Sequence, residues 1–126
     1  MGHTILIADD HEDNRELVHL MLRGAGYSVR EAKNGIECLD LARAETPDLI
    51  VMDLSMPVLD GWGLFEELKL DQRTREIPCI VLTAHADLDR NRALKKGFIA
   101  YVSKPFATED LLSAVAAALS HDTANR

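Results

Sequence analysis

Four positions of the chain carry polar or charged side chains where an apolar run of strand length ends. The apolar runs are 5–8, 49–52, 80–82 and 99–103, and the side chains that end or follow them are Asp9-Asp10, Asp53, Thr83 and Lys104. Because ligands of an open parallel sheet bind outside the carboxyl ends of its strands, we expect these side chains to converge on one pocket. Crowded carboxylates repel one another, and a divalent cation is the simplest partner for them.

These residue types together suit phosphoryl chemistry. Mg²⁺ prefers a few carboxylate and carbonyl oxygens plus water, at about 2.0–2.1 Å in octahedral geometry. A lysine ammonium is a point charge suited to a phosphate oxygen, and a carboxylate can attack phosphorus to give an aspartyl-phosphate. Taken alone, Asp9-Asp10 could simply cap the following helix. The coincidence of four such positions at the same ends of their strands favours a site.

Composition indicates one globular domain over residues 1–126. The chain has 47% hydrophobic residues and a net charge of −7, which argues against binding nucleic acid through a basic face. No run approaches the roughly 18 apolar residues of a membrane span. The start of the chain, 1–4, lacks a basic region, so we expect no signal peptide, no membrane partner and a cytoplasmic location.

The cysteines and histidines of the chain show no spacing typical of a metal site. Cys38 and Cys79 lack metal-ligand spacing, and we expect both to be buried as small apolar residues rather than joined in a disulfide. The five histidines are scattered, which argues against a histidine-based metal site.

Strand-length apolar runs alternate with helical patterns along the chain. Strands are expected at 5–8, 28–32, 48–53, 79–83 and 99–103, with helices between them and after the last. This alternation predicts an α/β fold: a flavodoxin-like, doubly wound, five-stranded parallel sheet of order 2-1-3-4-5 with five helices. The polar strand 28–32 belongs at an edge, and the apolar strands 48–53 and 79–83 belong at the centre. The core should span about 4–120, with 121–126 as a frayed tail.

One expected helix, 87–96, has few apolar residues to anchor it. Its packing should be weak, so it is the element most easily moved.

The chain resembles a receiver domain of a two-component response regulator, of the single-domain chemotaxis type. The resemblance covers residues 4 to about 120 and rests on four groups of residues and their spacing. These are Ile-Leu-Ile-Ala-Asp9-Asp10, Asp53-Leu-Ser-Met-Pro57 with Asp60-Gly61, Thr83-Ala84, and Lys104-Pro105-Phe106.

The resemblance implies a role for each matching residue. Asp53 would accept a phosphoryl group from a sensor histidine kinase or phosphotransfer protein. Asp9, Asp10, Asp53 and the backbone carbonyl of Ser55 would hold Mg²⁺, with Asp9 acting mostly through water. Lys104, Thr83 and the Ala84 amide would contact the phosphoryl group, Tyr101 would rotate as the switch aromatic, and the Lys104–Pro105 peptide would be cis.

Signal output and signal lifetime follow from the same resemblance. The output surface would be the face formed by 87–120, where a downstream protein binds. Ser55 and His85 occupy positions that vary in the family and affect the lifetime of the phosphate. The chain would thus be a signalling protein whose only catalysis is its own Mg²⁺-dependent phosphorylation and dephosphorylation.

Three other functions deserve comparison. A phosphatase of the haloacid-dehalogenase kind needs a second aspartate two residues after the nucleophile, where this chain has Ser55. A flavodoxin-like cofactor binder needs a phosphate-holding loop after the first strand, whereas residues 10–14 are acidic. A receiver fold that only scaffolds is disfavoured by the complete acidic set, and a phosphorylation assay decides the question.

Overall fold

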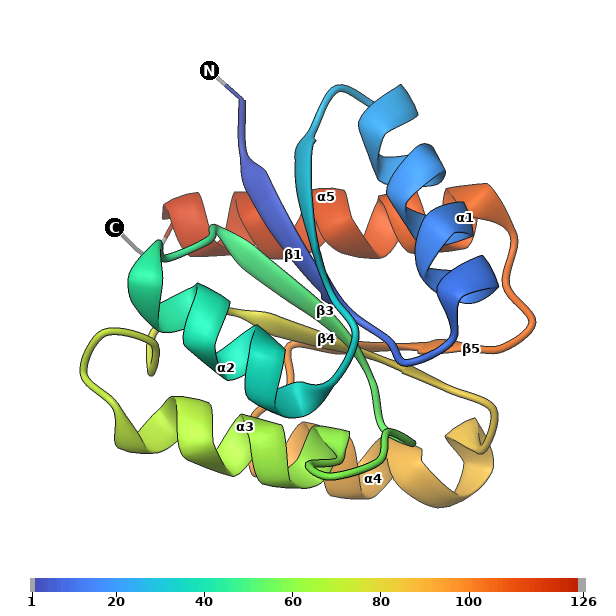
Figure 1. Ribbon diagram of the computed structural model, residues 1–126. Helices are drawn as coiled ribbons and strands as arrows, with labels where there is room; N and C mark the ends of the chain where they lie inside the picture. Colours follow the sequence, from blue (N-terminus) through green and yellow to red (C-terminus); the bar gives the residue numbers. More distant parts are fainter. Residues whose placement is uncertain (1, 125–126) are drawn as a thin grey trace.

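The computed structural model describes residues 2–124 and has a central parallel sheet between two layers of helices (Figure 1). The elements in order are β1 (Thr4–Ala8), α1 (Glu12–Gly24), β2 (Ser28–Ala32), α2 (Gly35–Ala44), β3 (Leu49–Asp53), α3 (Gly61–Leu70), β4 (Cys79–Thr83), α4 (Ala86–Lys96), β5 (Ala100–Ser103) and α5 (Thr108–Ala124). The strand order is β2-β1-β3-β4-β5, and all four pairings are parallel. The predicted fold class and strand order are confirmed, and polar β2 lies at an edge.

The strands place alternate side chains on the two faces of the sheet and so build two apolar cores. Helices α1 and α5 cover one face, and α2, α3 and α4 cover the other (Figure 1). Every residue of β3 and β4 is buried, as expected for strands covered on both faces. Cys38 on α2 and Cys79 on β4 are free and buried in the core on the face covered by α2, α3 and α4, as predicted.

The last helix differs from the prediction. Helix α5 continues to Ala124, so the expectation that the chain frays from 121 is wrong for 121–124. Ser, Asp and Thr are weak helix formers, but extending an existing helix adds one hydrogen bond per residue without a new nucleation cost. Residues 125–126 lie outside the described part of the chain.

Helix α4 is attached mainly by polar and cation–π contacts. Ala93 is the one buried side chain among those described in this helix, while Leu88 and Leu94 are 80% and 43% exposed. The Arg92 guanidinium lies 4.1 Å from the ring centre of Trp62 on α3, and Lys96 Nζ lies 2.8 Å from Glu66 Oε1. These contacts bury little apolar area, which confirms the weak anchoring predicted for this segment.

The connection from α4 into β5 is made by Gly97. This residue has φ +117°, the left-handed region that a side chain disfavours, and its N–H donates to the carbonyls of Ala93 and Leu94.

None of the helices within residues 2–124 combines the length and apolar character that crossing a bilayer requires.

Candidate functional site

The register of the sheet gathers the expected polar residues at its carboxyl edge. Ala8 pairs with Met52, so Asp9 and Asp53 emerge side by side at or just past the strand ends. Thr83 pairs with Ser103, and the N–H of Lys104 donates to the Thr83 carbonyl at 2.8 Å. The convergence that the strand ends predicted is therefore present in the structure.

Asp53 is buried, and both oxygens of its carboxylate are held. Lys104 Nζ donates to Oδ2 at 2.7 Å, and the backbone N–H of Ser55 donates to Oδ1 at 3.0 Å. A Cβ on Gly61 would lie 2.8 Å from the Asp53 carbonyl oxygen, so the loop after β3 can close over the strand only with glycine there. The carboxylate thus has one orientation, with an ammonium on one side.

Asp9 and Asp10 supply oxygens that lack hydrogen bonds. Asp9 is 1% exposed, and its Oδ1 accepts the His11 N–H at 2.9 Å. Asp9 Oδ2 and Asp10 Oδ1 are buried with no hydrogen-bond partner within the described residues, and Lys104 Nζ lies 3.9 Å from Asp9 Oδ2. Burial raises the pKa of the Asp9 carboxyl, and nearby Asp53 adds to the rise, against the lowering effects of the His11 N–H and Lys104.

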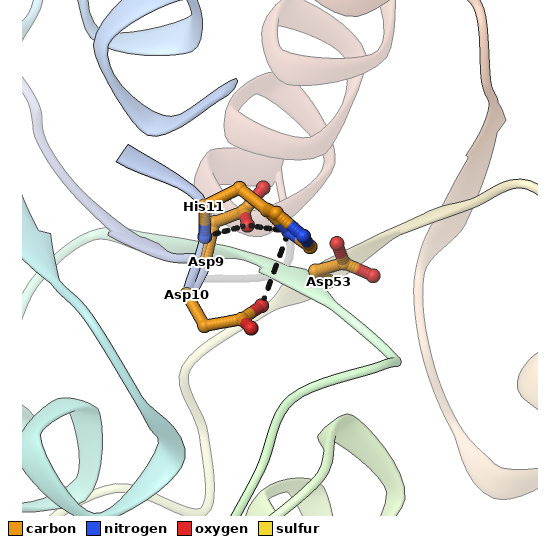
Figure 2. Close-up of side chains that lie close together, drawn as sticks. All are labelled: Asp9, Asp10, His11 and Asp53. Atoms are coloured by element: carbon orange, nitrogen blue, oxygen red, sulfur yellow. Dashed lines mark hydrogen bonds and ion pairs between the residues drawn. The ribbon is translucent and has the colours of Figure 1, made fainter. Parts of the chain in front are cut away.

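His11 joins these carboxylates, although the sequence analysis expected no histidine in a metal site and gave only His85 a role, in the lifetime of the phosphate. Figure 2 shows its ring lying among Asp9, Asp10 and Asp53, with Nδ1 3.5 Å from Asp9 Oδ1 and 3.3 Å from Asp10 Oδ1. The position directly after Asp9-Asp10 was the available signal. The scatter of the five histidines along the chain does not indicate this neighbourhood.

The donor set fits a divalent cation. One ligand atom each from Asp9, Asp10, His11 and Asp53 can be chosen so that all lie within 4.8 Å of one another. Two ligands on opposite sides of an octahedral Mg²⁺ would be about 4.2 Å apart. An open depression lined by Asp10, Ser55 and Asp60, among others, connects this group to solvent. Unpartnered buried carboxylate oxygens are costly without a cation, so these residues suit such an ion.

The hydroxyl proton of Thr83 is not directed at the carboxylates of Asp9, Asp10 and Asp53. The side chain is buried; its Oγ1 donates to Asp89 Oδ2 on α4 at 2.9 Å and accepts the His85 N–H at 2.9 Å. The sequence analysis missed Asp89, because an aspartate in the first turns of a helix also has an ordinary role there, next to the positive end of the helix dipole. Ala84 and His85 are exposed beside it.

Tyr101 precedes Lys104 in the sequence, and Pro105 directly follows it. The Tyr101 ring is half-buried on β5, with the Arg90 guanidinium of α4 5.2 Å from its centre. The Lys104–Pro105 peptide bond is cis. Residues on α4 therefore touch both Thr83 and Tyr101.

A second ionic cluster supports the first strand from outside the site. Arg15 donates from Nη1 to the Asp9 carbonyl at 2.9 Å and from Nε to Glu31 Oε1 at 2.8 Å. His19 Nδ1 lies 2.5 Å from Glu31 Oε2. Partial burial opposes ionisation of Glu31, but the contacts with His19 and Arg15 together leave the pKa of this carboxyl lowered.

Comparison with known proteins gives one consistent result. The response regulator receiver domain family matches residues 5–116. The polar-differentiation response regulator DivK of Brucella anthropi is 36% identical over 116 residues, which is 91% of this chain and 94% of that protein. The receiver domain of sensor histidine kinase PA1611 from Pseudomonas aeruginosa PAO1, solved with a magnesium ion coordinated in its active site cleft, is 33% identical. It aligns with a TM-score of 0.87 over 95% of this chain and 99% of its own. Chemotaxis response regulator CheY4 of Vibrio cholerae, 28% identical, has the same TM-score over 94% of this chain and 100% of its own.

Proposed function

Because the chain belongs to the response regulator receiver domain family, which works in phosphorelay signalling, we propose that it receives a phosphoryl group on Asp53. The observation that carries this proposal is the setting of the Asp53 carboxylate. It is buried, fixed by Lys104 and the Ser55 N–H, and adjacent to the unpartnered oxygens of Asp9 and Asp10. A carboxylate so placed can act as a nucleophile toward phosphorus.

Asp10, Asp53 and the backbone carbonyl of Ser55 would hold Mg²⁺, with Asp9 contributing mostly through water. When bound, Mg²⁺ would neutralise charge on the transferring phosphoryl oxygens. The related receiver domain of PA1611 has magnesium in its active site cleft. In this chain, the orphaned oxygens of Asp9 and Asp10 and the open depression beside them support the same use.

The remaining polar groups would serve the phosphoryl group. Lys104 already touches Asp53 and can turn its ammonium to a phosphoryl oxygen. Thr83 is the last residue of β4, and Ala84 follows it. The Thr83 hydroxyl and the Ala84 N–H would donate hydrogen bonds to a second phosphoryl oxygen. In transfer from a phosphohistidine, a P–N bond breaks and a P–O bond to Asp53 forms, so the protein mainly positions groups and balances charge.

The partners follow from family membership. Receiver domains interact with histidine kinases or phosphotransfer proteins, and we propose such a donor for this chain. A downstream protein would bind the face formed by 87–120, since α4 is weakly anchored and touches both Thr83 and Tyr101. A weakly held helix is an element that phosphorylation can bias between two positions.

Acetyl phosphate with Mg²⁺ tests the acceptor directly. Intact mass spectrometry should show one added phosphoryl group on the wild-type chain, none on Asp53→Asn, and an undiminished group on Asp40→Asn. Asp40 is a matched control because it is an exposed aspartate on α2, away from the site. Undiminished labelling of Asp53→Asn would overturn the proposal.

A further inference from the structure

We propose that His11 is a nitrogen ligand of the cation site and gives this chain a preference for transition-metal ions over Mg²⁺. The proposal deepens the function proposed above and rests on its metal site. Its starting point is the juxtaposition in Figure 2, where the ring of His11 lies among three carboxylates. No other histidine whose side chain the structure describes belongs to this cluster.

The spacing of the nitrogen is that of a ligand. Adjacent ligands of an octahedral ion with bonds of about 2.1 Å are roughly 3.0 Å apart. His11 Nδ1 lies 3.3 Å from Asp10 Oδ1 and 3.5 Å from Asp9 Oδ1, a few tenths of an ångström beyond that edge. A contraction of this size on binding would bring His11 Nδ1 and Asp10 Oδ1 to neighbouring vertices of one coordination shell, with Asp9 reached mostly through water.

The carboxylates supply an independent reason for an ion at this place. Asp9 is 1% exposed, yet its Oδ2 has no hydrogen-bond partner in the described part of the chain, and the same is true of Asp10 Oδ1. Of the two carboxylate oxygens paired with His11 Nδ1, Asp10 Oδ1 is the nearer. A cation held by Nδ1 and Asp10 Oδ1, with a bound water reaching Asp9 Oδ2, would satisfy all of these atoms.

The backbone fixes His11 so that its ring is available. Its N–H is bonded to Asp9 Oδ1, and its carbonyl accepts the Arg15 N–H at 2.9 Å inside the first turn of α1. The side chain is 65% exposed, so its other nitrogen can keep its proton in solvent while Nδ1 faces the carboxylates.

The nitrogen ligand determines which ions bind more tightly. Carboxylate, carbonyl and water oxygens suit Mg²⁺ and Mn²⁺, whereas an imidazole suits Ni²⁺, Co²⁺ and Zn²⁺. Replacing one oxygen or water position by His11 Nδ1 should therefore strengthen binding of Ni²⁺ and Co²⁺ far more than that of Mg²⁺. The variant that isolates this effect is His11→Phe, which keeps a ring at an exposed position but has no donor atom.

Calorimetric titration with Mg²⁺ and Ni²⁺ measures the preference. We expect Mg²⁺ affinity to change by less than about threefold in His11→Phe, and Ni²⁺ affinity to fall at least about tenfold. Losing residues that merely orient a metal ligand already costs roughly 10- to 100-fold. His3→Phe is the matched control, because His3 lies just before β1, at the end of the strand opposite the site. The Ni²⁺ affinity of this variant should equal that of the wild type.

Electron spin-echo modulation of bound Mn²⁺ shows whether the nitrogen coordinates. The wild-type complex should show ¹⁴N modulation from an imidazole, which His11→Phe should lose and His3→Phe should keep. Equal Ni²⁺ affinities together with a nitrogen-free signal would show that His11 is only a counter-ion and would overturn this inference alone. Asp53 phosphorylation with Mg²⁺ in His11→Phe would then still stand, so the two failures are distinguishable. Wild-type protein that binds neither Mn²⁺ nor Mg²⁺ would overturn the metal site itself.

Discussion

The hydroxyl of Thr83 is bonded to Asp89, 2.9 Å away on α4, and not to the carboxylate cluster beside it. A hydroxyl has one proton to give, so this bond keeps Thr83 from donating to any group on Asp53. It also fixes the start of α4, a helix with little buried apolar surface. The same hydrogen bond thus links the presence of a group on Asp53 to the position of α4.

Releasing this bond should favour the phosphorylated form. In Asp89→Ala, the hydroxyl is free to reach a phosphoryl oxygen, and a nearby negative charge is gone. Since a net hydrogen bond is worth about 1 kcal/mol, beryllofluoride should bind about fivefold more tightly. A double-mutant cycle checks the route: in a Thr83→Ala background, Asp89→Ala should bring only the smaller gain from lost charge. An equal gain in both backgrounds would show that the bond to Thr83 plays no part.

Removing the lysine should separate metal binding from signalling. In Lys104→Ala, the carboxylates lose a competing cation, so Mg²⁺ affinity should be unchanged or higher. The phosphoryl group loses a charged contact, so the conformational change on phosphorylation should shrink. Isothermal titration with Mg²⁺ is the measurement, and a large loss of Mg²⁺ affinity would contradict the assigned role.

The proposed output surface should be visible in amide exchange. With beryllofluoride and Mg²⁺, the largest changes should fall in α4, in β5 around Tyr101 and in α5 as far as residue 120, because α4 has the weakest apolar packing. Asp53→Asn should show no such change. A response confined to residues 11–45 would rule this surface out.

Position 85 should affect how long the phosphoryl group lasts. Hydrolysis needs a water in line with the breaking bond, and neither Ser55 nor His85 offers a carboxylate or amide to hold it. Spontaneous decay should therefore be slow in the wild type and faster in His85→Glu. Loss of the phosphoryl mass over time gives the rates for wild type, His85→Ala and His85→Glu. Equal rates in all three would remove position 85 from the mechanism.

The ion pair between Glu31 and its partners Arg15 and His19 should contribute to stability only when Glu31 is ionised. The pKa of Glu31 is lowered in the folded protein, so its contribution is present above the ordinary value of 4.5 and is lost as pH falls through the folded value. Glu31→Gln should cost about 0.5–1 kcal/mol at pH 7, discounted for solvent exposure, and nearly nothing at pH 3. Urea unfolding at both pH values measures this, with Glu16→Gln, an exposed residue of α1, as the control. A cost that is equal at both pH values would exclude the ion pair as its cause.

The parts of the molecule that sequence patterns predicted are those fixed by periodicity and topology. Apolar runs placed β3 and β4 at the centre, and parallel pairing then forced Asp9, Asp53, Thr83 and Lys104 to one edge. The bonds of Asp89 and His11 depend instead on how α4 docks and how the loop after β1 turns, which local residue types do not determine. The end of α5 was predicted too early because residue preference was weighed without the preceding helical turns.

The single tryptophan of the chain gives these changes an optical signal. Trp62 lines the same open depression as Asp10 and Asp89, its ring meets Phe98 edge-on, and the Arg92 guanidinium of α4 covers its face. A charge that arrives in the depression, or a helix that slides away with its arginine, changes the electric field at the indole. Ion binding and helix movement should therefore both alter the natural fluorescence of the protein, and Arg92→Ala would leave the first response while weakening the second.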